Sequence, residues 1–488
     1  GKFVLMTMDD AAVRIYDVKT GDEVAVPIAF EDGEWLTITP EGYYNASEKG
    51  AQYLSVTVGE ASYSVERFYD VFYRPDIVMA KLRGEDIRDL ITITMTDAIK
   101  SPPPVVTINP VAAPPASPKA RVCYNVKSAG GGIGEVRLFH NGKLIESDGY
   151  YKEAAKAAAE KTQLAAMDGK AIYAEMRSVK IKEKAEASPL TAKAKGDAVS
   201  ECRDIDAVPG ENEVSVTAFN RDNTVQSSMQ TVRFSSATKP EEPHLYILSI
   251  GIDRYRDSAI DLKYAVKDSL DMKEKLVAQA QTIYRPQNIH CELLADEKAT
   301  KAGITGRLSE LSQRIKPGDG FILFAAGHGV LLQNQYYMLT ADYDGTVADA
   351  SLISSNEIVE MSKRIKSLSQ LFIFDTCHAG GVDTIVSGLY DARMSVLAKK
   401  MGLHIYASAS DKQTSMDGYK GNGLFTYTLL DGLNNNRGAD RNGDGRVTVV
   451  GLGGYARERT TNLSREIGHS QTPLIINFGK DYPVYRIR

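Results

Sequence analysis

Cysteine is scarce in this sequence of 488 residues, which contains only four, at Cys123, Cys202, Cys291 and Cys377. They are too few and too widely spaced for a disulfide framework, and no CxxC pair is present to suggest a zinc site built from thiolates. Cys123 and Cys202 fall within one predicted β domain, but the sequence leaves open whether they are bridged. A thiol redox protein or a metal protein is therefore not favoured.

Long apolar runs and an excess of basic charge are also absent. No segment is long and apolar enough to span a bilayer, and no signal peptide begins at residue 1. The formal net charge is -5, so the composition does not favour nucleic-acid binding. We therefore expect neither a nucleic-acid partner nor a membrane partner.

The first residue is Gly1 and not Met, so we expect a fragment or a processed product. The missing signal peptide then says little about the parent protein. We expect a cytoplasmic location, with a periplasmic or secreted location left open.

Residues 1–100 are expected to form a β region. The stretch "KFVLMTMDDAAVRIYDVKTGDEV" contains two strand-like runs around a polar turn, and a second turn follows. Tyr16 and Asp17 stand where WD repeats carry Trp-Asp, so this part resembles the end of a propeller blade. One partial blade cannot bury its own face, so we expect further blades before it and a regulatory partner of the N-terminal β domains.

Two further regions precede the C-terminal half. Residues 101–118 contain seven of the 18 prolines and are expected to form a stiff, extended linker at a domain boundary. Residues 119–240 are expected to form an immunoglobulin-like β-sandwich, with a strong hairpin signal at Asn141-Gly142. An Ala-rich and then low-complexity insert is expected at about residues 149–205; a solvated, flexible insert is favoured over one that binds an acidic partner.

Residues 241–488 show strand-like runs alternating with helical patterns, which predicts an α/β domain with a mostly parallel sheet and helices on both faces. The chain is thus expected to be multidomain, with all-β regions before an α/β domain. In such sheets, functional residues gather beyond the carboxyl ends of the strands. His328 after "FILFAAG" and Cys377 after "LFIFDT" occupy such places.

Either residue alone would be read as an ordinary core thiol or a polar turn residue. Together they indicate a nucleophilic thiol with an imidazole nearby, because both end buried strands and both have glycine close by. Alternate side chains share a face along a strand, so Asp375 and Cys377 are expected to point one way, and Thr376 and His378 the other. We therefore expect His328, and not the adjacent His378, to serve Cys377.

The ordered motifs "AAGHG" and "FDTCHAGG" resemble those of caspase-like cysteine peptidases, in particular the metacaspase and bacterial orthocaspase branch. The resemblance covers about residues 244–478 and includes "LSIGIDRYRDSAIDLKYAVKDSL", "YYMLTADYD" and "GNGLFTYTLLDGL". It implies that Cys377 attacks the peptide carbonyl and that His328 protonates the leaving amine. The backbone N–H groups of Gly329 and Cys377 would form an oxyanion hole. No cofactor is required for this chemistry.

Substrate specificity can be inferred from charge. Caspases carry Gln two residues before the cysteine, whereas this chain has Asp375 there, which would attract Arg or Lys and repel acidic side chains. By the resemblance, Asp268 in "YAVKDS" would supply a second carboxylate, although Tyr264 and Lys267 depart from the family motif. Ala326 replaces a serine that is common in the family. We expect protein substrates with Arg or Lys at the cleavage site.

The sequence also suggests possible self-cleavage points and a calcium-binding loop. Residues 380–400 stand where caspases are cut during activation, so an enzyme of basic specificity has candidate self-cleavage points at Arg393, Lys399 and Lys400; an uncut surface loop is the alternative. The stretch "ADRNGDGRVTVVGL" resembles a calcium loop with Asp440, Asn442 and Asp444 as ligands. Gly451 stands where the bidentate Glu is expected, so at most weak binding of an activating calcium ion is anticipated.

A catalytically silent scaffold that uses the caspase-like fold for protein–protein contacts is the competing hypothesis. Pseudo-enzymes usually lose the cysteine or the histidine, and both are present here. This favours the endopeptidase.

Overall fold

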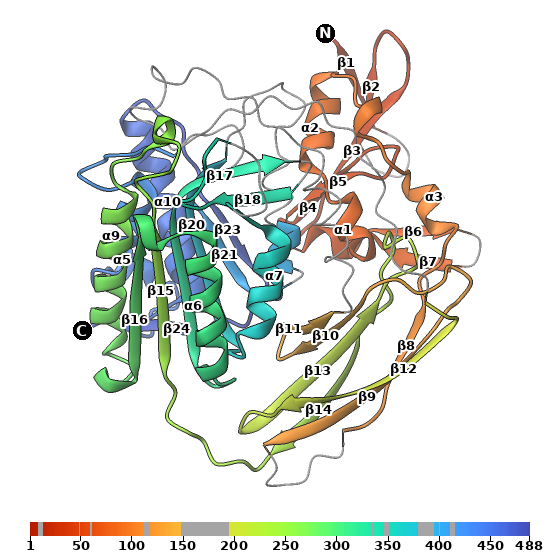
Figure 1. The fold of residues 1–488 in the computed structure, drawn as a ribbon. Coiled ribbons are helices and arrows are strands. Elements are labelled where there is room, and N and C mark those ends of the chain that lie inside the picture. The colour runs from red at the N-terminus through yellow and green to blue at the C-terminus, as the bar shows by residue number, and fades with distance from the viewer. Residues whose placement is uncertain are drawn as a thin grey trace.

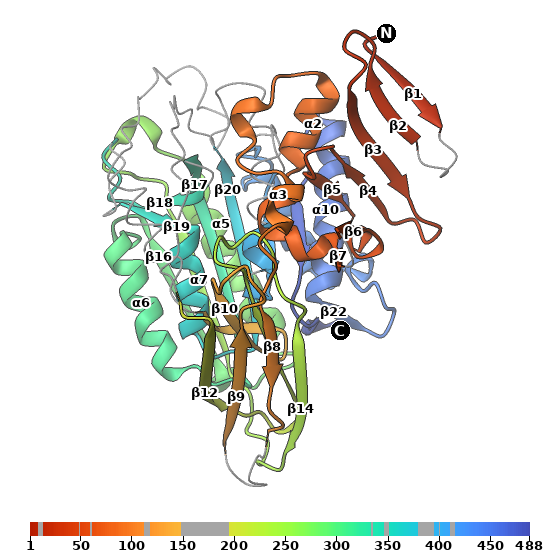
Figure 2. The same ribbon diagram turned by 90° about the vertical axis from the view of Figure 1, so that its right-hand side faces the viewer.

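The computed structural model describes residues 1–7, 13–47, 49–58, 61–111, 118–147, 195–332, 335–345, 351–378, 395–399, 401–409 and 415–488. Within them the chain forms an N-terminal region, a β-sandwich and a C-terminal α/β domain. In both views the sandwich lies at one end of the molecule, and the N-terminal region lies beside the α/β domain (Figures 1 and 2). No helix in this part of the chain is long and apolar enough to cross a membrane.

The N-terminal region begins with an antiparallel sheet in the order β1-β2-β3-β4-β5. Its strands are β1 Phe3–Thr7, β2 Val13–Asp17, β3 Glu23–Ala29, β4 Trp35–Ile38 and β5 Tyr44–Ala46, and a separate hairpin pairs β6 Ser55–Val58 with β7 Ala61–Ser64. This meander agrees with the predicted β region but does not establish a propeller.

The expectation of β structure throughout residues 1–100 is wrong for the last third of that region. Helices α1 Tyr69–Phe72, α2 Pro75–Arg83 and α3 Met95–Ile99 lie there. Proline is favoured at the first position of a helix, and Gly84 ends α2 in the left-handed conformation, with φ 70°. Aromatic and branched residues of this stretch pack into the core of the N-terminal region, among them Phe68, Phe72 and Ile77.

The second region is a sandwich of two sheets in the orders β12-β9-β8 and β11-β10-β13-β14, with one apolar core between them. The strands are β8 Val105–Ile108, β9 Lys119–Lys127, β10 Val136–His140, β11 Lys143–Ser147, β12 Ala198–Asp206, β13 Gly210–Ala218 and β14 Gln230–Ser236. Asn141 and Gly142 both have positive φ, 48° and 83°, which is the geometry of the predicted two-residue hairpin turn.

Two predicted boundaries of this region need correction. The segment 101–118 is not a linker throughout, because β8 lies inside it and pairs with β9 as an edge strand. An edge strand tolerates neighbouring prolines, and the run "VVTI" between them keeps its N–H groups. The insert does not extend to residue 205, because β12 begins at Ala198. Residues 148–194 lie outside the described part of the chain.

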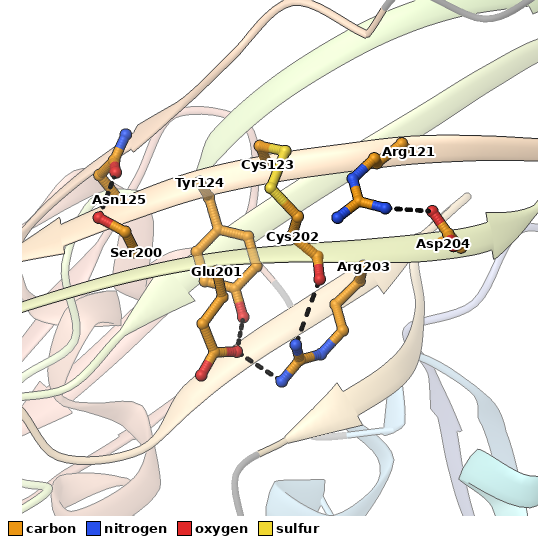
Figure 3. Close-up of a disulfide and its surroundings, with 9 residues drawn as sticks. All are labelled: Arg121, Cys123, Tyr124, Asn125, Ser200, Glu201, Cys202, Arg203 and Asp204. Atoms are coloured by element: carbon orange, nitrogen blue, oxygen red, sulfur yellow. Dashed lines mark hydrogen bonds and ion pairs between the residues drawn. A yellow bond between two sulfur atoms is a disulfide. The ribbon is translucent and has the colours of Figure 1, made fainter.

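A disulfide joins Cys123 of β9 to Cys202 of β12, two residues that face each other in the antiparallel register. Figure 3 shows the bond crossing between the two strands, with ion pairs and hydrogen bonds on either side. Along β9 the core-facing residues are Ala120, Val122, Tyr124 and Val126, so Cys123 belongs to the outer face. The disulfide therefore ties the strands together from outside the core.

The C-terminal domain is built on a sheet in the order β16-β15-β17-β20-β21-β23. Neighbouring strands are parallel except for β21 and β23, which are antiparallel. The strands are β15 Leu245–Gly251, β16 Ile289–Ala295, β17 Gly320–Leu332, β20 Ser369–His378, β21 His404–Ala407 and β23 Leu474–Asn477. Beyond this path, β18 Gln335–Leu339 pairs with β17 and with β19 Leu352–Ser354, while β22 Arg446–Thr448 pairs with β24 Pro483–Arg486.

Helices cover both faces of this sheet, as the sequence predicts (Figure 1). The helices α6 Lys301–Arg314 and α7 Ser355–Arg364 contribute to the core on one face. The other face is covered by α5 Ala265–Ala280, α9 Leu424–Gly432 and α10 Val449–Glu466. A capping box begins α7, where Ser354 and Glu357 bond reciprocally.

Candidate active site

The register of β17 and β20 brings the two candidate catalytic residues together. Ten consecutive residue pairs join these parallel strands, from Gly320 with Ser369 to Gly329 with His378. In this ladder His328 is paired with Cys377. Each of the two residues comes at the end of an apolar run that is almost wholly buried. Such runs are typical of the central strands of a parallel sheet, which is where β17 and β20 lie. The side chains of Cys377 and His378 lie outside the described part of the structure.

His328 is fully buried, and the loop that follows β15 holds it in place. Its backbone N–H donates to the Tyr255 hydroxyl at 2.9 Å, and the two rings lie with centroids 5.2 Å apart. Its Nε2 lies 2.7 Å from the Ile260 carbonyl oxygen, at the end of a short 3-10 turn, Ser258–Ile260. A carbonyl can only accept, so Nε2 carries the proton. In the neutral ring, Nδ1 is then the nitrogen that can take up a second proton.

Asp375 and Thr376 contact different parts of the domain, as strand alternation predicts. Asp375 is fully buried and accepts hydrogen bonds from the hydroxyls of Thr426, on α9, and Ser415, at 2.5 and 3.4 Å. The Thr376 hydroxyl instead hydrogen-bonds the hydroxyl of Tyr336, in β18, at 2.8 Å. Asp375 thus lies on the face of the sheet covered by α9.

Asp268, in the first turn of α5, is also fully buried. It accepts hydrogen bonds from the Asn422 side chain at 2.9 Å and from the Gly423 N–H at 3.0 and 3.1 Å. Asp268 and Asp375 come from different elements, yet both contact the segment 415–426. The structure therefore brings the two predicted carboxylates to one short stretch of chain.

Gly329 lies inside β17, and not in a turn. A Cβ atom added at this position would lie 2.8 Å from the Tyr336 ring and 3.0 Å from the Thr376 hydroxyl. Packing thus accounts for the absence of a side chain here. Ala326, in the same strand, is buried, and its carbonyl accepts from the N–H of Ile252.

Of the three candidate self-cleavage points, only Lys399 lies in the described part of the chain; Arg393 and Lys400 do not. Lys399 is part of a helical segment, and its side chain is only 20% exposed. Its Nζ lies 3.1 Å from Glu66 and 4.1 Å from the centroid of the Tyr69 ring, both in the N-terminal region. Burial lowers the pKa of Lys399. A protease could reach this lysine only after it left these partners.

The predicted calcium loop has few free oxygens. The two carboxylate oxygens of Asp440 accept the N–H groups of Gly443 and Gly445, at 2.9 and 2.8 Å, and Asp444 accepts the N–H of Arg446. Asn442 is exposed. Among the described residues, no group of three or more His, Cys, Asp and Glu side chains is arranged to hold a metal ion.

Several residues of this site could not be predicted from the sequence. Tyr255, Ser415, Asn422 and Thr426 all contact a predicted site residue, but each is far from its partner along the chain; Asn422 and Asp268 are separated by 154 positions. The local signals are the glycines of "GYKGNG", which indicate a tight turn, and the stretches "GNGLFTYTLLDGL" and "LSIGIDRYRDSAIDLKYAVKDSL" that carry the resemblance. None of them reveals which residues are in contact.

Comparison with known proteins gives a family match in the C-terminal domain. The model of the Caspase domain family matches residues 246–445. No curated protein matches the chain. Among solved structures, the crystal structure of protein GSU0716 from Geobacter sulfurreducens is 17% identical, with a TM-score of 0.34, over 50% of this chain and 97% of that chain. That score is too low to bear on the fold. The caspase-domain match supports a function of the cysteine-peptidase type.

Proposed function

We propose that the caspase-like domain is a cysteine endopeptidase that cleaves peptide bonds after Arg or Lys, with Cys377 as the nucleophile and His328 as its base and acid. The observation that carries this proposal is the pairing of His328 with Cys377 in the register of two central parallel strands. The caspase-domain match supports the same chemistry from an independent direction.

In the proposed reaction, Nδ1 of His328 takes the thiol proton and the Cys377 sulfur attacks the carbonyl carbon of the scissile bond. As the C–N bond breaks, the His328 imidazolium gives its proton to the leaving amine. Water then hydrolyses the thioester, which releases the acid and restores the thiol. The Ile260 carbonyl favours this route, because it keeps the Nε2 proton in place while Nδ1 exchanges its own. The N–H groups of Gly329 and Cys377 would receive the developing oxyanion.

Specificity for Arg and Lys is supported by Asp268 and Asp375. Both carboxylates are fully buried and both contact the segment 415–426. A buried carboxylate attracts a cationic side chain strongly and disfavours an acidic one. No cofactor enters this proposal, and calcium is at most an activator bound at Asp440, Asn442 and Asp444.

The disulfide bears on where the protein acts. Bonds of this kind persist in oxidising compartments such as the periplasm and the extracellular space. The Cys123–Cys202 bond therefore supports a periplasmic or secreted location over the expected cytoplasmic one.

Labelling of Cys377 tests the function directly. The full chain is incubated with acyloxymethyl ketones bearing Arg, Lys or Asp, and labelled peptides are identified by mass spectrometry. We expect labelling by the Arg and Lys probes, its loss in His328→Ala, and its retention in His290→Ala, a histidine on the edge strand β16 that contacts His244. Preferential labelling by the Asp probe would overturn the specificity. No labelling with or without calcium would support the silent scaffold.

A further inference from the structure

Asn422 joins two carboxylates of α5 through one amide group. Its Nδ2 lies 2.9 Å from an oxygen of Asp268 and 2.7 Å from an oxygen of Asp271. A side-chain amide has two N–H donors on that nitrogen, so these contacts use both. Its Oδ1 faces Nζ of Lys267 at 3.4 Å. Asn422 is only 6% exposed, so the geometry is shielded from water.

The two carboxylates differ in surroundings. Asp268 is fully buried, whereas the Asp271 side chain is 29% exposed and pairs with Lys267. They lie three residues apart on one helix, where side chains are neighbours and like charges repel. The amide of Asn422 offsets this repulsion without adding a positive charge.

We propose that Asn422 is a positioning residue for substrate binding, which holds the Asp268 carboxylate in one orientation for the Arg or Lys side chain of the substrate. This inference rests on the proposed function. The backbone N–H of Gly423, the residue after Asn422, donates to both oxygens of Asp268. Two consecutive residues therefore hold the carboxylate. The same segment also contacts Asp375, through Ser415 and Thr426.

The role predicts a specific kinetic pattern. A residue that orients a binding carboxylate affects the Michaelis constant for basic substrates and leaves the chemistry at Cys377 unchanged. Losing a hydrogen bond to a charged group should raise KM about tenfold, while kcat changes by less than about twofold. A residue needed only for folding would instead reduce the active fraction and lower kcat.

The experiment compares Asn422→Ala and Asn422→Asp in the full chain on peptide substrates with Arg or Lys. Alanine removes both donors, and aspartate keeps the shape but cannot donate when ionised. We expect both variants to raise KM. If charge alone governed binding, the added carboxylate of Asn422→Asp would strengthen the binding of basic substrates. A KM of Asn422→Asp equal to or below that of the parent would therefore overturn the proposal.

Matched controls are available at Asn434, an exposed residue just after α9 whose Oδ1 accepts from Lys275 of the same helix α5. Asn434→Ala and Asn434→Asp should leave KM unchanged. The rate of Cys377 alkylation by iodoacetamide, which needs no basic side chain, reports the folded fraction of each variant. A parent chain that cleaves neither Arg nor Lys substrates contradicts the proposed function; a parent that cleaves them, with KM unchanged in both Asn422 variants, contradicts only this inference.

Discussion

His328 of β17 and Cys377 of β20 occupy the same level of the central sheet, because the register of two parallel strands pairs them directly. Ten consecutive pairs fix that level, and a slip of one residue would place Thr376 or His378 opposite His328 instead. The relative height of the two candidate catalytic residues is therefore set by the core of the sheet and not by the loops beyond it.

Gly329→Ala should disturb the end of β17. The new methyl group would lie 2.8 Å from the Tyr336 ring, so the ring or the strand must shift. We expect a loss of about 1–3 kcal/mol in the free energy of unfolding, together with slower labelling of Cys377. Urea unfolding and probe labelling measure the two effects. Gly306→Ala in α6 is the control, because no atom lies within 4 Å of an added Cβ and no loss is expected there.

Glu66→Gln should make Lys399 accessible to cleavage. The carboxylate of Glu66 lies 3.1 Å from Nζ, and without it the lysine loses its ionic partner in the N-terminal region. We expect Cys377-dependent fragments ending at Lys399 in the variant and none in the parent, as read by mass spectrometry. Glu41→Gln, which removes a different lysine pair of the same region, should produce none. Fragments ending at Lys399 in the parent chain would contradict the protective role of this contact.

Removal of the disulfide by Cys123→Ala with Cys202→Ala should destabilise the sandwich without disturbing its core. The bond closes a sequence separation of 79 residues from the outer face of the sheet, so it mainly restrains the unfolded chain. The chain-entropy estimate is about 4.5 kcal/mol, which is an upper value. Thermal unfolding, followed by circular dichroism, measures the change. An unchanged transition would show that the bond contributes nothing to stability.

Lys143 predicts a pH dependence of stability. It is fully buried, its Nζ donates to the Ile365 carbonyl of the α/β domain, and burial lowers its pKa to about 7. An unfolded lysine titrates near pH 10, so between about pH 7 and 10 the unfolded chain binds a proton that the folded chain does not. The free energy of unfolding should therefore rise with pH in this window, by about 1.4 kcal/mol per pH unit at most.

Lys143→Met should remove this contribution. The difference in unfolding free energy between parent and variant, measured in urea at pH 7, 8 and 9, isolates Lys143 from other titrating groups. A difference that stays constant across these pH values would contradict the prediction.

The structural features that depend only on a local sequence pattern can be predicted from the sequence. Asn141-Gly142 is a hairpin because both residues accept positive φ, and Ser354 with Glu357 starts a helix because the two cap each other. The alternation that separates Asp375 from Thr376 is likewise a property of any strand. These features need no knowledge of the rest of the chain.

The remaining features depend on tertiary contacts. Residues 69–99 are rich in aromatic and branched side chains, which favour strands, yet packing against the neighbouring core makes them helical. The strand β8 lies among prolines, and only its partner β9 reveals it. Asn422 and Asp268 meet because α5 and α9 cover the same face of the sheet. No local pattern in the sequence contains that relationship.

The position of β23 limits how this protein can be divided for study. The caspase-domain match ends at residue 445, but α10 and β23 follow it, and β23 is hydrogen-bonded along the edge of β21. A fragment cut at residue 445 would expose the unpaired edge of β21 and the apolar surface beneath α10, both of which favour aggregation. Insolubility of such a fragment would then reflect the missing strand and helix, and it would say nothing about the activity of the intact chain.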